Sequence, residues 1–353
     1  MVVNLIRWLC EVNKSGMGVS MAVKKVLITD YVWPSVEPEE KVLEKYGIEL
    51  LVAPNGDEDT LVKMAKEVDG ILTCFAKVTG NVVKSAKNCK VIGRFGVGVD
   101  NIDVEEATNQ GILVTYVPDY CVDEVSEHVI GLLLAWNRRI VLHNNDTKLV
   151  GWGNAGLGMR IMRLRGKKIG IIGFGRIGRM VAQKAQAFGL EILSFDPMVE
   201  VSVMSEVGVK KVELEDLLCQ SHFVTLHSPL IATTTNMMGR EQFKMMRNDA
   251  FLINCARGGL VDENALFTAL ESGWIAGAGL DVLVDINPGI NHRLIENDKI
   301  IVTPHTAFFS QEAVLELEQR AAGQVGDVLI GKMPENIINI EVLSKKGLRA
   351  MIS

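Results

Sequence analysis

The stretch KKIGIIGFGRIGRMVAQKAQAFGLEILSFDP, residues 167–197, decides the fold. It reads as a buried strand, a glycine-rich turn, a helix and a second strand. Gly173, Gly175 and Gly178 form a G-x-G-x-x-G pattern between the first strand and the helix. The first glycine permits a tight turn, the second lets a pyrophosphate approach the backbone, and the third allows the helix to pack closely on the strand. The stretch therefore predicts a dinucleotide-binding unit.

The residue that ends the second strand indicates which dinucleotide binds. Asp196 lies 18 residues after Gly178, where a carboxylate accepts hydrogen bonds from an adenosine ribose and repels a 2′-phosphate. The next residues, Pro197 to Glu200, include no arginine that could neutralise such a phosphate. NAD is therefore favoured over NADP. The alternative is a glycine turn without a ligand.

Strands and helices alternate along the rest of the chain, which predicts parallel sheets. The long segment 121–146 is predicted to be one helix, and 310–331 another. We expect two doubly wound α/β domains, the second inserted into the first. The expected boundaries are an N-terminal extension at 1–20, one domain at 21–120 plus 309–345, and the nucleotide-binding domain at 121–308. The predicted strands are 25–30, 48–53, 70–75, 90–95, 112–117, 168–174, 190–196, 222–227, 250–255, 276–282 and 299–305, and the helices of the first domain are 37–46, 58–68, 80–88 and 103–110.

Composition excludes several classes of protein. The formal net charge of −6 gives no basic field, so nucleic acid is not an expected partner. The six cysteines are scattered singly, which fits neither a zinc site nor a disulfide scaffold; we expect no metal and a cytoplasmic location. No apolar run approaches the roughly 18 residues of a membrane span, so a membrane is not expected either.

Two polar residues stand directly after predicted strands that follow the nucleotide fingerprint. Arg257, in NCARGGLVDE, could bind a carboxylate and a carbonyl through its planar fork, although a single arginine there is more often structural. His305, in TPH, could act as an acid or base, although a single histidine is usually a satisfied polar residue. With Asp281 they occupy three successive strand ends, where ligands bind in open α/β sheets. A cation and an acid/base group beside a nicotinamide indicate hydride transfer to a 2-keto acid.

At this point the chain resembles the D-isomer specific 2-hydroxyacid dehydrogenases, over about residues 24–342. DYCVDEVSEH and PHTAFFS resemble the bacterial branch akin to C-terminal-binding proteins and short phosphoglycerate dehydrogenases. The resemblance implies a flavodoxin-like substrate-binding domain with an inserted Rossmann NAD-binding domain. It rests on RFGVGVDNID (94–103), SEHVIGLLL (126–134), GIIGFGRIG (170–178), LHSPL (226–230), NCARGGLVDE (254–263), GAGLDV (277–282) and TPH (303–305).

The resemblance also implies roles for single residues. The amides of Val97 and Gly98 would hold the substrate carboxylate, although a glycine-rich loop is otherwise only a tight turn, and Ala76 would line the substrate pocket. Arg257 would bind the carboxylate and keto oxygen, and His305 would exchange the proton. His128 is expected to be structural. The implied cofactor-binding residues are Gly173, Gly175, Arg176, Ile177, Gly178, Asp196, His227, Thr234, Cys255, Arg257, Asp281 and His305.

One departure from the family pattern concerns the carboxylate partner of His305. The family places a glutamate five residues after the aspartate of LDV, just before a proline; here Ile286 or Asn287 stands there, depending on the count. Asp285 is the remaining acid nearby, but in an extended segment residues 285 and 286 point to opposite faces. Only an irregular loop would bring Asp285 to His305. Without a partner, an imidazole with a pKa near 6.5 is only about one tenth protonated at pH 7.5.

Two functions from different classes remain open. One is an NAD-dependent oxidoreductase that interconverts a small 2-keto acid and its D-2-hydroxy acid, with Asp285 as a possible substitute acid. The other is an NAD(H)-responsive binding or regulatory protein with marginal turnover. A dehydrogenase for a non-carboxylate substrate is disfavoured by Arg257 and the glycine loop. Helix 121–146 resembles the element through which the family dimerises, so a homodimer is expected.

Overall fold

The computed structural model describes residues 23–152, 161–286 and 288–352, and it divides the chain into two compact units. The first unit ends at Val117 and resumes at Glu318, and the second runs from Pro118 to Leu317. Two breaks in the chain were expected, after residues 120 and 308. The second break lies between Leu317 and Glu318, later than expected. It falls inside helix α13 (Gln311–Leu329), so the start of this helix belongs to the second unit and its end to the first.

The first unit contains a parallel five-stranded sheet with strand order β2-β1-β3-β4-β5. This 2-1-3-4-5 order is that of flavodoxin-like folds, as predicted. The strands are short, and each expected strand loses one to three residues at its ends. The elements are β1 Lys24–Ile28, α2 Glu37–Glu44, β2 Ile48–Val52, α3 Glu58–Met64, η1 Ala65–Glu67, β3 Gly70–Thr73, α4 Gly80–Ser85, β4 Val91–Arg94, α5 Val104–Asn109, β5 Leu113–Thr115 and η3 Ile340–Ser344, together with the end of α13.

The second unit contains a parallel seven-stranded sheet with order β12-β11-β10-β9-β6-β7-β8. From β8 to β11 this is the 3-2-1-4-5-6 order of a Rossmann fold, with β12 added at the edge, so the predicted fold class is confirmed. The elements are α6 Val122–Asn137, α7 Ile140–Val150, β6 Lys168–Ile172, α8 Arg176–Ala187, β7 Glu191–Phe195, α9 Val201–Ser205, β8 Lys210–Lys211, α10 Leu214–Gln220, β9 Phe223–Leu226, α11 Arg240–Met245, β10 Phe251–Asn254, η2 Gly258–Leu260, α12 Glu263–Glu271, β11 Gly277–Leu280 and β12 Ile300–Val302.

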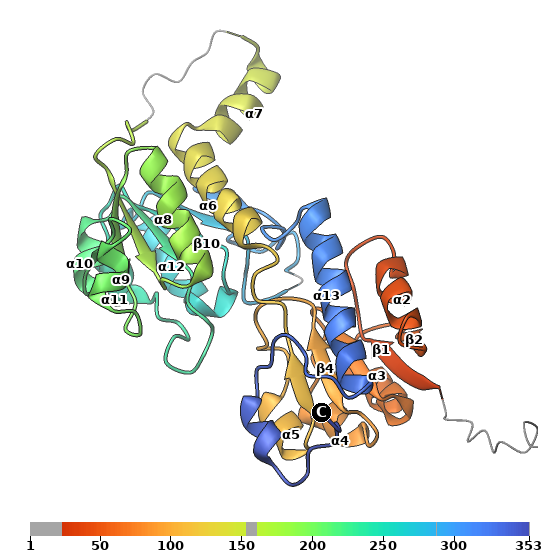
Figure 1. The fold of residues 1–353 in the computed structure, drawn as a ribbon. Helices are drawn as coiled ribbons and strands as arrows, with labels where there is room; N and C mark the ends of the chain where they lie inside the picture. Colours follow the sequence, from red (N-terminus) through yellow and green to blue (C-terminus); the bar gives the residue numbers. More distant parts are fainter. Residues whose placement is uncertain (1–22, 153–160, 287, 353) are drawn as a thin grey trace, which may run out of the picture. The chain divides into compact units, whose positions relative to one another are not determined.

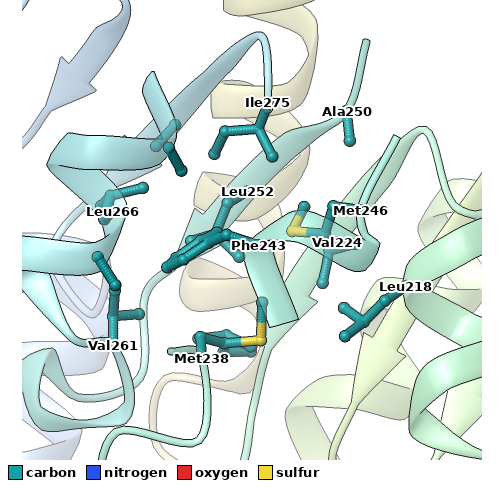
Figure 2. Close-up of a cluster of buried hydrophobic side chains, with 14 of the residues drawn as sticks. Leu218, Val224, Met238, Phe243, Met246, Ala250, Leu252, Val261, Leu266 and Ile275 are labelled. Carbon is teal, nitrogen blue, oxygen red and sulfur yellow. The ribbon is translucent and has the colours of Figure 1, made fainter. Parts of the chain in front are cut away.

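Helices cover both faces of the seven-stranded sheet. On one face α6 and α8 lie side by side (Figure 1), and Trp136 of α6 stacks on Phe251 of β10 with ring centroids 4.5 Å apart. The next residue of β10, Leu252, points to the opposite face, because side chains alternate along a strand. There it joins a buried cluster with Phe243 of α11 and Leu266 of α12 (Figure 2). Burial on both faces explains the continuous apolar runs of these strands.

The predicted single helix 121–146 is a wrong prediction. Two helices, α6 and α7, occupy this segment, and they are separated at Arg138 and Arg139. Arg139 adopts left-handed backbone angles with φ at 55°, which no α-helix tolerates in its interior. Its guanidinium lies over the Trp136 ring, 4.4 Å from the centroid. That contact with a buried, stacked tryptophan is tertiary, so helix periodicity in the sequence did not reveal the break.

No helix within the described ranges is long and apolar enough to cross a membrane.

Two buried carboxyl groups face each other in the first unit. Glu39 of α2 is 0% exposed and accepts a hydrogen bond from the Trp33 indole at 3.0 Å, and Glu318 of α13 is 4% exposed. Burial raises the pKa of Glu39 to about 7. Burial, together with the charge of Glu39, raises the pKa of Glu318 to about 8. In the unfolded chain both groups ionise near pH 4.5, so the native state holds protons that the unfolded state has released.

This pair predicts stability that decreases with rising pH. The unfolding free energy should fall as pH rises from about 4.5 to about 8, because the folded chain binds more protons across that window. We expect Glu318→Gln to raise the unfolding free energy by about 2 kcal/mol at pH 8, with little change at pH 4.5. Denaturant unfolding at the two pH values measures this. Glu44→Gln, an exposed glutamate of α2, is the control, and an equal effect of Glu318→Gln at both pH values would contradict the assignment.

Candidate active site

Three strand ends meet at one edge of the seven-stranded sheet. β10, β11 and β12 are adjacent and parallel, so their carboxyl ends lie at the same edge. The pairing continues beyond the strands: the Asp281 amide donates to the Asn254 carbonyl at 3.0 Å, and the His305 amide donates to the Asp281 carbonyl at 2.8 Å. The segments that carry Arg257, Asp281 and His305 are therefore brought together, as expected from their positions at three successive strand ends.

Asp281 organises the segment that contains His305. Its carboxylate is 2% exposed and accepts the Thr303 hydroxyl at 2.6 Å and the amides of Thr306 and Ala307, both at 2.9 Å. Three donors compensate for burying the charge. They also bracket His305, whose backbone is left-handed with φ at 54°. Such a conformation is costly for a residue other than glycine, and it persists only where its surroundings impose it.

His128, which was expected to be structural, joins this network from helix α6. Its Nε2 lies 2.9 Å from the Thr303 hydroxyl oxygen and 3.7 Å from a carboxylate oxygen of Asp281. Because the Thr303 hydroxyl donates to Asp281, it accepts from His128, so His128 carries a proton on Nε2. His128 thus connects α6 to the segment that holds His305.

Arg257 stands at the end of β10 and is half-buried. Its Nη1 donates to the Ala256 carbonyl at 2.8 Å, and its own carbonyl accepts from the Asn254 side chain at 2.9 Å. The next residue must be glycine, because a Cβ on Gly258 would lie 2.1 Å from the carbonyl carbon of Leu283. The chain after β11 therefore passes directly against the residue that follows Arg257.

The segment in which the family glutamate is missing is irregular. It forms no strand, and the backbone bends at residues 284–286. The Val284 amide donates to Glu263 at 2.8 Å, Asp285 is exposed, and Ile286 is 65% exposed. The opposite-face argument against Asp285, which assumed an extended chain, does not apply here. Asn287, the other candidate position for the glutamate, lies outside the described residues.

The glycine loop has the shape that a dinucleotide requires. Gly173 has φ at 94°, and a Cβ there would lie 2.7 Å from the backbone of His227. A Cβ on Gly178 would lie 2.3 Å from the Gly173 carbonyl oxygen. A Cβ on Gly175 would meet no atom of the described chain within 4 Å. Only Gly173 and Gly178 are thus required by packing, and the space at Gly175 is open, as a bound pyrophosphate needs.

The surroundings of this loop suit NAD. Helix α8 begins at Arg176, with Ile177 next, and no side chain caps its first turn, so backbone N–H groups are left for phosphate oxygens. Asp196 accepts the amides of Phe174 and Met198, each at 2.8 Å. The carboxylate is thereby fixed beside the glycine loop, with further lone pairs for a ribose.

The remaining residues that were predicted to contact the cofactor lie in the second unit, in distinct environments. His227 lies 3.0 Å from the Thr225 hydroxyl through Nε2, and burial lowers its pKa to about 3, so it stays neutral. The Thr234 hydroxyl donates to the Pro229 carbonyl at 2.6 Å and shapes the turn after β9. Cys255 is buried, and burial, aided by the Asp281 charge, raises the pKa of its thiol. It therefore remains protonated and is no nucleophile.

The predicted substrate-side residues belong to the first unit. Ala76 and the two residues before it, Cys74 and Phe75, donate their amides to Asp30 at 2.6–3.0 Å. In contrast, the amides of Val97 and Gly98 have no acceptor within the described part of the chain. These two amides are therefore available to bind an anion.

Sequence reasoning missed Asp30 and the role of His128. A signal existed for Asp30, since a carboxylate directly after the buried run KVLIT stands at a strand end. No local pattern marks His128, because its partner Thr303 is 175 residues away.

Comparison with known proteins shows the family of the chain. Residues 130–307 match the model of the D-isomer specific 2-hydroxyacid dehydrogenase, NAD binding domain. A D-3-phosphoglycerate dehydrogenase of Methanocaldococcus jannaschii is 39% identical over 92% of this chain, which spans 61% of that protein. A glyoxylate reductase of Thermococcus litoralis is 36% identical, and the match covers 86% of this chain and 94% of that protein.

A solved structure supports the same relationship. The D-lactate dehydrogenase of Aquifex aeolicus, in complex with NAD and lactic acid, has a TM-score of 0.80 at 26% identity and covers 87% of this chain and 96% of its own. Together, the fold, the NAD-binding loop and these matches establish that the chain belongs to the D-isomer specific 2-hydroxyacid dehydrogenase family, whose cofactor is NAD.

Proposed function

We propose that this chain is an NAD-dependent dehydrogenase that interconverts a small 2-keto acid and its D-2-hydroxy acid. The observation that carries the proposal is the meeting of Arg257 and His305 at one sheet edge, with Asp281 holding the His305 segment. A cation for a carboxylate and a group that exchanges a proton are the two requirements that 2-keto acid reduction places on the protein.

Each residue has a proposed role. NAD, when bound, supplies the acceptor or donor of the hydride. Arg257 binds the carboxylate and polarises the keto oxygen through its planar fork, and the free amides of Val97 and Gly98 bind the carboxylate. His305 gives its proton to the keto oxygen in reduction and removes it in oxidation.

Cofactor binding is proposed for the residues of the second unit. Asp196 binds the adenosine ribose, and Arg176 and Ile177 contact the pyrophosphate through the first turn of α8. His227, Thr234, Cys255 and Asp281 border the nucleotide. Because all three acceptor bonds of Asp281 go to residues 303–307, its main proposed contribution is to fix the His305 segment.

We further propose that Asp285 supplies the negative charge that the family glutamate normally gives to the catalytic histidine. Two features support this. The chain at 284–286 is irregular, and its start packs against the residue after Arg257. A carboxylate near an imidazole keeps it protonated to higher pH and fixes its tautomer.

A small or apolar substrate side chain is proposed. Ala76 carries no charge, and the relative matched over 94% of its length is named a glyoxylate reductase.

A homodimer through α6 and α7 is also proposed, since α7 buries none of its residues and exposes Ile140, Val141, Leu142 and Leu149. The cytoplasmic location expected from the single cysteines stays a prediction.

The direct test is turnover. Purified protein with NADH should reduce at least one of pyruvate, glyoxylate, hydroxypyruvate, phenylpyruvate or a branched 2-keto acid, followed by NADH absorbance between pH 5.5 and 8.5. His305→Asn should lower kcat by roughly 10³-fold or more while NADH binding is retained, because the proton donor is lost. Absence of turnover on every substrate, with NADH binding intact, would favour the binding-protein alternative.

A second prediction concerns Asp285. Asp285→Asn should lower kcat/KM about 10-fold at pH 8 and move the midpoint of the pH profile toward about 6.5, the ordinary imidazole value. Adding Ile286→Glu in that background should restore activity, since Ile286 is exposed and occupies the glutamate position by the ungapped count. Asp298→Asn, at another exposed acid of the same unit, is the control. An unchanged profile in Asp285→Asn would rule out Asp285.

The cofactor loop yields a third prediction. Gly175→Ala should leave the melting temperature within about 2 °C, because the added methyl meets no protein atom. It should nevertheless weaken NADH binding at least 10-fold, since the methyl enters the space that a pyrophosphate needs. Gly131→Ala, at an open glycine inside α6, should leave NADH binding unchanged and should raise the melting temperature slightly, because alanine favours a helix. NADH fluorescence titration and thermal unfolding measure both effects, and wild-type affinity in Gly175→Ala would contradict the assigned site.

A further inference from the structure

Arg94, at the end of β4, is a buried cation that has no part in the proposed reaction described above. It is 7% exposed, and no carboxylate in the described ranges forms an ion pair with it. Its Nε donates to the Gly98 carbonyl at 2.9 Å, and its Nη1 donates to the Phe95 carbonyl. The guanidinium also lies 6.0 Å from the centroid of the Phe75 ring. An arginine with only neutral partners leaves a positive charge uncompensated inside the loop.

The backbone of residues 95–98 wraps around this guanidinium. Gly96 has φ at 144°, and a Cβ there would lie 3.0 Å from Nη1 of Arg94. Its carbonyl accepts the Val117 amide at 3.1 Å. Three of the four carbonyls from Phe95 to Gly98 are therefore held, two by Arg94 and one by the chain after β5.

The two bonds from Arg94 fix the ends of the loop, and the bond from Val117 fixes the peptide that carries the Val97 amide. In a trans peptide the C=O and N–H point in opposite directions, so fixing the Gly96 carbonyl turns the Val97 amide away from Val117. The amides of Val97 and Gly98 have no acceptor within the described residues, and Val97 is 38% exposed. The loop therefore combines two free donors with a buried, unpaired cation, and both features favour a bound anion.

We propose that Arg94 is a positioning residue for the substrate carboxylate. It fixes the carbonyls of Phe95 and Gly98, at the two ends of the loop, and so holds in place the segment whose Val97 and Gly98 amides bind the carboxylate. The proposal rests on the proposed function, because it takes the ligand of these amides to be the carboxylate of a 2-keto acid. It adds a residue that contacts no substrate but controls substrate affinity.

The test compares two arginines of the first unit that both hold backbone carbonyls. Arg94→Lys keeps the charge but cannot donate in two directions from a planar fork, so KM for glyoxylate or pyruvate should rise about 10-fold. Arg94→Met should raise it about 100-fold. In both variants kcat should stay within about threefold and the Kd for NADH unchanged, since the NADH site lies in the second unit.

Arg349 supplies the matched control. Its Nη1 donates to the carbonyls of Ala86, Lys87 and Cys89 at 2.7–3.1 Å, away from the 95–98 loop. Arg349→Lys and Arg349→Met should lower the melting temperature of the first unit without changing KM. Binding of oxamate, an isostere of pyruvate, to the enzyme with NADH gives a readout that needs no turnover. Its affinity should fall in the Arg94 variants by the same factors.

The outcomes separate this inference from the proposed function. A wild-type KM and oxamate affinity in both Arg94 variants would overturn the role of Arg94 while turnover stands. An equal rise of KM in the Arg349 variants would also overturn it, since the effect would then be general loosening of the unit. If the wild-type protein reduces no 2-keto acid, the proposed function fails first.

Discussion

The buried carboxylate of Asp281 is the interaction on which the candidate active site depends. It ties the end of β11 to the segment after β12 through the Thr303 hydroxyl and the amides of Thr306 and Ala307. A carboxylate with only 2% exposure is costly unless its lone pairs are filled, and these donors fill them. The same bonds maintain the left-handed backbone of His305. The strain at His305 is thus offset by a charge that the fold has buried beside it.

The first unit uses two charged side chains in complementary ways. Asp30 accepts the amides of residues 74–76 and so occupies the donors of one loop. Arg94 donates to carbonyls of the 95–98 loop, in which the amides of Val97 and Gly98 have no acceptor among the described residues. Of these two neighbouring strand ends, only the second therefore offers donors to an anion. Charged side chains that bind backbone groups, rather than each other, decide which loop is available for a ligand.

Much of the fold could be predicted from the sequence because its causes are local. Alternating apolar runs and helices require parallel sheets, and Gly173 and Gly178 mark positions where a side chain would collide with backbone. The strand ends that carry Arg257, Asp281 and His305 also follow from that alternation.

The break at Arg139 was not predictable, because a contact with Trp136 stabilises it. The partnerships of Asp30, Arg94 and His128 were missed for a related reason: each depends on how a loop folds or on a distant segment. The irregular course of residues 284–286 belongs to the same class, and it reopens the role of Asp285.

In the proposed reaction, hydride passes between NAD and the C2 carbon of a 2-keto acid while His305 exchanges a proton with the oxygen. The most direct measurement uses NADH deuterated at the nicotinamide C4 with whichever 2-keto acid the protein reduces. The expected product is a 2-hydroxy acid of D configuration with deuterium on C2 and none on oxygen after exchange with water. A product of L configuration, or a product without deuterium from either C4 position, would contradict it.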